Sequence, residues 1–177
     1  MRLISLTLAV LAAATFSQAT NGDDTPKRSA ELQVLDRFVG SWDFDVTIKS
    51  TNGVTETGQT SETRSWTLGG KFVQFENPKT EKPDEPEFQM LVTYDPATKT
   101  YPGVLMSGSS RSSVDGTWDQ PTQTMTFRGK SADNSGTTFL FKNRFLDNDH
   151  SESSGVIKDA AGKVILELTQ KQTRRKK

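Results

Sequence analysis

The chain has 177 residues, with 22 lysines and arginines, 22 aspartates and glutamates, one histidine and no cysteine. A formal charge of zero gives no electrostatic basis for binding nucleic acid, which requires a basic surface. The lack of cysteine excludes disulfides and thiolate metal sites, so a hydrophobic core must hold the fold. A chain of this size can bury enough surface to fold as one domain.

The N-terminal residues predict a signal peptide. Residues 1–14 carry one positive charge followed by an apolar run, and Ser17-Gln18-Ala19 has the small-x-small form of a cleavage site. We therefore expect a signal peptide over residues 1–19, cleavage after about Ala19, and export to the periplasm or the medium. The apolar run is shorter than a membrane-spanning helix and no second run follows, so we expect no stable membrane insertion.

A short helix is expected to precede the strands. Residues 20–29 are polar, with one proline, and are typical of a flexible leader. Ser29 is a good N-cap for a helix over about residues 30–38, and Glu31 lies in the first turn, where the helix dipole favours an acid.

Alternating segments separated by turn signals follow the helix. Apolar and polar residues alternate from Trp42 to Lys49, which is typical of a strand with one wet side. Turn signals then recur at Asn52-Gly53, Gly69-Gly70, Asp95-Pro96, 119–122 and 159–162. This spacing predicts about ten antiparallel strands.

The order of these strands favours a closed barrel over a sandwich. Consecutive strands with short connections close readily up and down, and closure removes exposed edges. We predict an all-β fold, an up-and-down antiparallel barrel over residues 30–174 with the helix as a plug, and a basic tail at 175–177. A barrel of about ten strands is wider than side chains readily fill, so a ligand cavity is expected. The inward face is expected to be mostly apolar, with polar interruptions such as Gln74 and Asn143.

Several phrases together resemble a known family. They are residues 35–42, Trp66-Thr67-Leu68-Gly69-Gly70-Lys71-Phe72, residues 94–101, 116–119 and 147–150, and Thr173-Arg174. In this order and spacing they resemble the bacterial family called domain of unknown function 1579, whose members look like lipocalin-type (calycin) barrels. The resemblance implies the barrel and an exported or small soluble bacterial setting, and it implies no activity.

The resemblance also implies a structural pair at the closed end. In lipocalin-like barrels the first tryptophan packs against an arginine of the last strand, a cation over an aromatic face. Trp42 and Arg174 match these positions, and the neighbouring Arg175 leaves open which arginine stacks. We expect this pair to close the barrel and not to bind a ligand.

No catalytic or metal-binding arrangement is predicted. The chain has no Gly-x-Ser-x-Gly elbow, and nothing in the spacing supports a triad built on His150. Asp147, Asp149 and His150 lie within four residues, but we interpret them as a solvated acidic turn, because no second histidine or any cysteine completes a transition-metal shell. His150 is the only histidine that could ligate haem, a hypothesis we rank below the absence of any cofactor.

The orientation of Arg64 is left open by the sequence. Glu62, Arg64 and Trp66 alternate on one face, so an inward Trp66 implies an inward Arg64. A buried arginine needs a carboxylate or an anionic headgroup to offset its desolvation. The alternative, which the sequence favours, is that a bulge or an overhang of the strand turns Arg64 outward.

We expect the protein to bind a small apolar or amphipathic ligand without transforming it. The candidate lumen residues are Phe44, Arg64, Trp66, Phe88, Met90, Phe127, Phe139 and Phe141. One alternative is an exported protein-interaction module, which predicts a filled lumen and an exposed apolar patch. Another is a hydrolase or isomerase that uses a lumen carboxylate such as Glu62 with Arg64. Neither the ligand nor the oligomeric state follows from the sequence.

Overall fold

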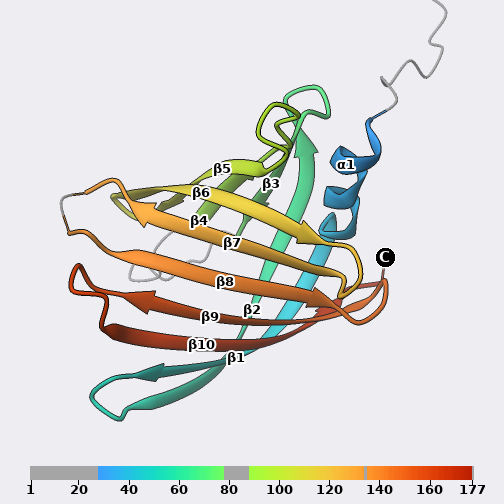
Figure 1. The fold of residues 1–177 in the computed structure, drawn as a ribbon. Coiled ribbons are helices and arrows are strands. Elements are labelled where there is room, and N and C mark those ends of the chain that lie inside the picture. The colour runs from blue at the N-terminus through green and yellow to red at the C-terminus, as the bar shows by residue number, and fades with distance from the viewer. Residues whose placement is uncertain (1–27, 78–87, 134, 177) are drawn as a thin grey trace, which may run out of the picture.

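The protein is a closed antiparallel barrel (Figure 1). The computed structural model describes residues 28–77, 88–133 and 135–176. The strands follow one another around the wall in chain order, and the last strand pairs with the first. The predicted barrel of about ten strands is therefore confirmed, and the sandwich is excluded.

Two short helical segments lead into the barrel. They are the α-helix α1 (Ala30–Gln33) and the 3₁₀ helix η1 (Val34–Arg37). The strands are β1 (Gly40–Ser50), β2 (Thr55–Thr67), β3 (Phe72–Glu76), β4 (Phe88–Val92), β5 (Tyr101–Ser107), β6 (Ser110–Asp119), β7 (Thr124–Ser131), β8 (Thr138–Phe145), β9 (His150–Lys158) and β10 (Val164–Arg174).

The seam between β1 and β10 closes the barrel. It runs from Trp42 opposite Arg174 to Ser50 opposite Leu166. Closure pairs the backbone groups of both terminal strands, which would otherwise be exposed edges.

The predicted helix is present but changes type halfway. Ser29 Oγ accepts a hydrogen bond from the Leu32 backbone N–H, as expected of the cap, and α1 then gives way to η1. In a 3₁₀ helix residues i and i+3 are eclipsed, so Leu35 and Phe38 point the same way. Both are buried at the end of the barrel, so the tighter winding aligns these two side chains as a plug.

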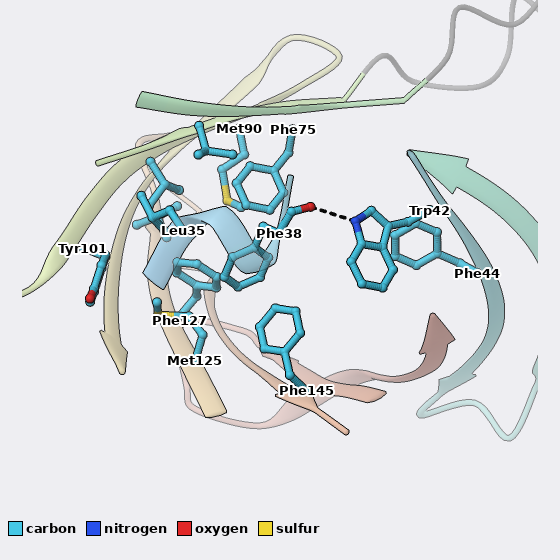
Figure 2. Close-up of a cluster of buried hydrophobic side chains, with 13 residues drawn as sticks. Leu35, Phe38, Trp42, Phe44, Phe75, Met90, Tyr101, Met125, Phe127 and Phe145 are labelled. Carbon is cyan, nitrogen blue, oxygen red and sulfur yellow. Dashed lines mark hydrogen bonds between the residues drawn. The ribbon is translucent and has the colours of Figure 1, made fainter. Parts of the chain in front are cut away.

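The plug is surrounded by aromatic side chains (Figure 2). The Phe38 ring centroid lies 5.4 Å from that of Phe75 and 4.9 Å from that of Phe145. Trp42, which is fully buried, donates from Nε1 to the Phe38 carbonyl at 2.7 Å. The main core of the molecule therefore lies at the helix end of the barrel.

Both ends of the folded region extend beyond the predicted bounds. Arg28, predicted to belong to a flexible leader, lies 4.1 Å from the Trp66 ring centroid and 3.0 Å from Asp36. Arg175, in the predicted basic tail, pairs with Asp43. Each arginine therefore pairs with a specific acid of the barrel or plug.

Part of the predicted N-terminal organisation is not covered. The expected signal peptide, residues 20–27 of the expected leader and Lys177 lie outside the described residues. In the part of the chain that the structure describes, no helix has the length and apolar character needed to cross a membrane.

Candidate functional site

The barrel encloses a cavity of about 370 Å³. Phe38 of the plug bounds it at one end, and it reaches Ser107, which adjoins the β5–β6 turn. Figure 1 shows this turn at the end of the barrel opposite the helix. All the predicted lumen residues except Trp66 line the cavity, namely Phe44, Arg64, Phe88, Met90, Phe127, Phe139 and Phe141.

Three phenylalanines of the lining lie against glycines on neighbouring strands. Phe127 is opposite Gly116, Phe139 opposite Gly129 and Phe141 opposite Gly155. A Cβ atom added to Gly129 or to Gly155 would come within 2.0 Å of the facing ring. The missing side chains let the rings rest against the wall, so the barrel keeps an open lumen although its inner face is rich in phenylalanine.

Arg64 faces the lumen. Its side chain is 4% exposed, its Nη2 lies 2.6 Å from Glu62 Oε2, and its Nε donates to the same oxygen at 2.8 Å. The outward orientation that the sequence favoured was wrong. Strand β2 pairs with β1 without a bulge from Gly40–Arg64 to Lys49–Thr55, and Glu62 on the same face supplies the carboxylate that offsets desolvation.

Aromatic rings complete the surroundings of the Arg64 guanidinium. Its Cζ lies between 5.1 and 5.6 Å from the ring centroids of Phe38, Trp42, Phe44 and Phe75. The negative face of an aromatic ring attracts a cation, and the attraction grows when the pair is removed from water. Arg64 is therefore held by one carboxylate and by the aromatic core together.

A hydrogen-bonded network runs from Arg64 across the adjoining wall. Gln172 Oε1 accepts from Arg64 Nη2 at 3.2 Å and from Ser151 Oγ at 3.0 Å, and Gln172 Nε2 donates to Ser153 Oγ at 3.1 Å. Ser153 Oγ in turn donates to Gln170 Oε1 at 2.6 Å and lies opposite Asn143 in the register. We call this set the polar belt, made of Glu62, Arg64, Gln172, Gln170, Ser151, Ser153 and Asn143.

Two donors of the polar belt are buried without a partner. Arg64 Nη1 and Asn143 Nδ2 have no hydrogen-bond acceptor among the described residues, and both side chains line the cavity. Asn143 as a residue is 6% exposed. A buried donor without an acceptor is uncommon and costs about 1–3 kcal/mol. The wall of the lumen therefore contains two donors that no acceptor of the described residues satisfies.

Some of these polar residues were missed by sequence reasoning. Asn143 was expected to face inward and does. Gln74 was also expected to face inward, but it lies on the opposite face of β3 from the buried Val73 and Phe75, where it bonds Glu76. Gln170 and Gln172 were not singled out. Both could have been found from their alternation with Leu168, because this spacing places all three residues on one face of β10.

Trp66 does not line the cavity, contrary to the prediction. It shares a face of β2 with Arg64, but it lies at the end of the strand beside the plug. Its Nε1 donates to Asp36 Oδ1 at 2.7 Å, and Arg28 lies over its ring. Trp66 therefore covers the closed end.

Arg174, and not Arg175, stacks on Trp42. Its Cζ lies 4.3 Å from the ring centroid, and the guanidinium donates to the carbonyls of Arg37 and Val39 in the plug and of Asn148. Burial lowers the pKa of Arg174 from its ordinary value, and the Asp149 carboxylate opposes this effect. The pair joins the plug to the last strand at the closed end.

The Asp147 carboxylate of the acidic turn is hydrogen-bonded to groups of the same turn. Asp147 accepts from the backbone N–H groups of Asp149 and His150 and contacts His150 Nδ1 at 2.9 Å. The hydrogen bond from His150 is the main reason that the pKa of Asp147 is lowered. His150 is exposed and does not line the cavity, so it offers the lumen no haem ligand. Within residues 28–77, 88–133 and 135–176, no cluster of three or more His, Cys, Asp or Glu could hold a metal ion.

The barrel is similar to several solved structures. Rv2717c from M. tuberculosis superposes with a TM-score of 0.64 at 14% identity, over 84% of this chain and 99% of that one. The S-type phycobiliprotein lyase CPES from Guillardia theta superposes with a TM-score of 0.57 at 14% identity, over 90% of this chain and 99% of that one. A protein of unknown function of the DUF3598 family from Nostoc punctiforme superposes with a TM-score of 0.55 at 9% identity, over 80% of this chain and 48% of that one. At these identities the similarity shows the fold alone.

The sequence comparisons agree with the resemblance noted from the motifs. No curated protein sequence matches the chain at a significant level. The family described as "Protein of unknown function (DUF1579)" matches residues 27–174, which span the plug and every strand of the barrel. The chain therefore belongs to the DUF1579 family.

Proposed function

We propose that the protein binds one small apolar or amphipathic molecule in the barrel lumen and releases it unchanged. The observation that carries this proposal is a cavity of about 370 Å³ with an aromatic lining and two buried donors without partners. Ligand cavities in proteins commonly measure about 300–1,000 Å³ and combine apolar walls with a few placed polar groups. The lumen has this composition.

A catalytic role is less well supported by the lumen. Glu62 and Arg64 are the only charged side chains among the described residues of the lining, and they are bound to each other. A hydrolase or isomerase would have to break this buried pair to use either group, and the lining residues described include no histidine. The fold shared with a phycobiliprotein lyase carries no lyase activity to this chain at 14% identity.

The interaction module is also less well supported. It requires a filled lumen, whereas the barrel contains a cavity. The large exposed apolar side chains of the described residues come from separate turns and strands, at Val54, Leu68, Val104, Leu146 and Ile165. Scattered exposed apolar residues are normal on a soluble domain and do not by themselves make a docking surface.

Native mass spectrometry tests the binding proposal directly. The full chain is produced in a bacterial host and purified without detergent, and any molecule released is extracted and identified. We expect either a bound apolar or amphipathic molecule or saturable one-to-one uptake of the neutral dye Nile red. A ligand-free mass together with no uptake of Nile red by folded protein would contradict the proposal.

Export is part of the same proposal and rests on the sequence of residues 1–19. When the chain is expressed with its own N-terminus, the mass of the mature protein should correspond to a chain that begins at Thr20 and should be found outside the cytoplasm. Cytoplasmic protein that retains residues 1–19 would contradict export without affecting the binding proposal.

A further inference from the structure

The charges of the lumen cancel. Glu62 and Arg64 are the only charged residues of the described lining, and their side chains are 9% and 4% exposed. An entering carboxylate would place a second negative charge near Glu62 in a region largely removed from water, where like charges repel strongly. An uncharged molecule meets no such cost.

Two acceptors of the polar belt are each shared by two donors. Gln172 Oε1 already accepts from Arg64 and Ser151, and Gln170 Oε1 accepts from Ser153 and Gln172. The fully buried side-chain groups without partners among the described residues are both N–H donors, Arg64 Nη1 and Asn143 Nδ2. A ligand group that satisfies them must be a hydrogen-bond acceptor.

The two donors lie at opposite ends of the polar belt, on β2 and β8, which are separated by β1, β10 and β9. Arg64 bonds Gln172, Gln172 bonds Ser153, and Ser153 lies opposite Asn143 on β8. The facing surfaces of the cavity are apolar, with Phe75, Met90 and Leu105 on the strands β3 to β5. The ligand therefore needs an acceptor that reaches one of these donors, and hydrocarbon against the rest of the lining.

We propose that the lumen selects uncharged amphipathic molecules with a carbonyl-type acceptor, such as an ester or a ketone, and discriminates against carboxylates. Arg64 Nη1 and Asn143 Nδ2 are the donors available to such acceptors, and Glu62 excludes anions by neutralising Arg64. This inference rests on the proposed binding function and specifies the class of its ligand.

Three probes of similar length separate charge from hydrogen bonding. Methyl decanoate, decanoate and undecane are each titrated against the full-length protein loaded with Nile red, at a pH near 8 where the carboxylate is ionised. We expect methyl decanoate to displace the dye with a Kd roughly tenfold below that of decanoate, because one buried charge or one unsatisfied donor corresponds to a factor of about this size. Undecane should also bind more weakly than the ester.

Two variants assign the preference to the named residues. Glu62→Gln leaves the Arg64 charge uncompensated, so decanoate should become the tighter ligand. Asn143→Leu removes one donor, so the affinity for methyl decanoate should fall several-fold while that for undecane is kept. The control is Glu152→Gln, since Glu152 is exposed on the outer face and pairs with Arg144 there. It should leave all three affinities unchanged.

The outcomes distinguish the inference from the binding proposal. Binding of decanoate to the wild-type protein as tightly as the ester, or equal binding of ester and undecane, overturns the inference and leaves lumen binding intact. Failure of the dye and all three probes to bind overturns the proposed function itself. The wild-type series decides the matter even if a variant does not fold.

Discussion

Trp42 is the side chain on which the closed end of the barrel depends. Two arginines lie near its ring, Arg64 at 5.4 Å on the lumen side and Arg174 at 4.3 Å. Arg64 is bound to a carboxylate, whereas Arg174 is bound mainly to backbone carbonyls of the plug and of the turn before β9. The first arginine therefore shapes the cavity, and the second fastens the plug.

Replacement of Arg174 should destabilise the barrel markedly. Arg174→Ala removes the cation from the Trp42 face and the donors from the plug carbonyls, and we expect a loss of roughly 2–3 kcal/mol. Urea unfolding followed by tryptophan fluorescence measures the change. The control is Arg175→Ala, whose exposed pair with Asp43 should contribute little. Equal effects of the two substitutions would contradict the assigned role of Arg174.

Gly40 should not tolerate a side chain. It has a φ of +136°, and a Cβ atom there would lie 2.6 Å from Arg174 Nη1. Gly40→Ala should therefore lower the free energy of unfolding by about 1–3 kcal/mol, through backbone strain and displacement of Arg174. Thermal unfolding provides the measurement, and a midpoint unchanged from wild type would refute the argument.

At the scale of elements, the plug is fastened to β5 through Tyr101. Its hydroxyl donates to the Glu31 carbonyl at 2.9 Å, and its ring is buried. Burial, with smaller effects of Tyr94 and Glu31, raises the pKa of Tyr101 from the ordinary value of 10.0 to about 12. The folded state therefore favours the neutral phenol.

This pKa predicts a loss of stability at alkaline pH. Because the pKa of Tyr101 is raised in the folded state, its contribution is complete below pH 10 and is lost as the pH rises toward 12. Tyr101→Phe removes the titrating group, so the free energy of unfolding should fall less steeply over this range than in the wild type. Urea unfolding at about pH 9 and about pH 11.5 tests the difference. An equal fall in the free energy of unfolding between these two pH values in both proteins would exclude Tyr101 as the source of the pH dependence.

The paired glycines and phenylalanines are the second feature at this scale. Gly155→Ala would bring a methyl group within 2.0 Å of the Phe141 ring, which must then move toward the lumen. We expect a destabilisation of about 1–3 kcal/mol and weaker uptake of Nile red. Gly58→Ala is the matched control, because a Cβ atom at Gly58 of β2 meets nothing within 4 Å. Full dye uptake by Gly155→Ala would show that these contacts do not keep the lumen open.

At the scale of the whole molecule, stability depends on closing the ring of strands. A chain that ends at Lys163 lacks β10 and leaves β1 and β9 with unpaired edges. We expect this chain to aggregate, because open edges pair with other chains. A chain that ends at Lys176 is the control and should match the full chain in size-exclusion chromatography and circular dichroism. A soluble shortened chain with the elution volume expected of its length would contradict this account.

The architecture follows from local sequence patterns. Alternation from Trp42 to Lys49 and turn signals such as Asn52-Gly53 are local, and a regular series of them leaves few arrangements other than an antiparallel barrel. The inward phenylalanines of β7 and β8 followed from the same period of two. Strand β4 ends at Val92 although Tyr94 continues its alternation, and beyond it the pairing is reduced to isolated contacts such as the bridge from Asp95 to Thr100.

The character of the lumen depends on contacts between residues that are distant in the chain. Arg64 turns inward because Glu62 offsets its charge and because Gln172, 108 residues away in the chain, accepts one of its hydrogen bonds. The cavity stays open because Phe141 rests on Gly155 of the next strand. The cost of burying a charge and the space left by a ring both depend on partners that local sequence does not specify.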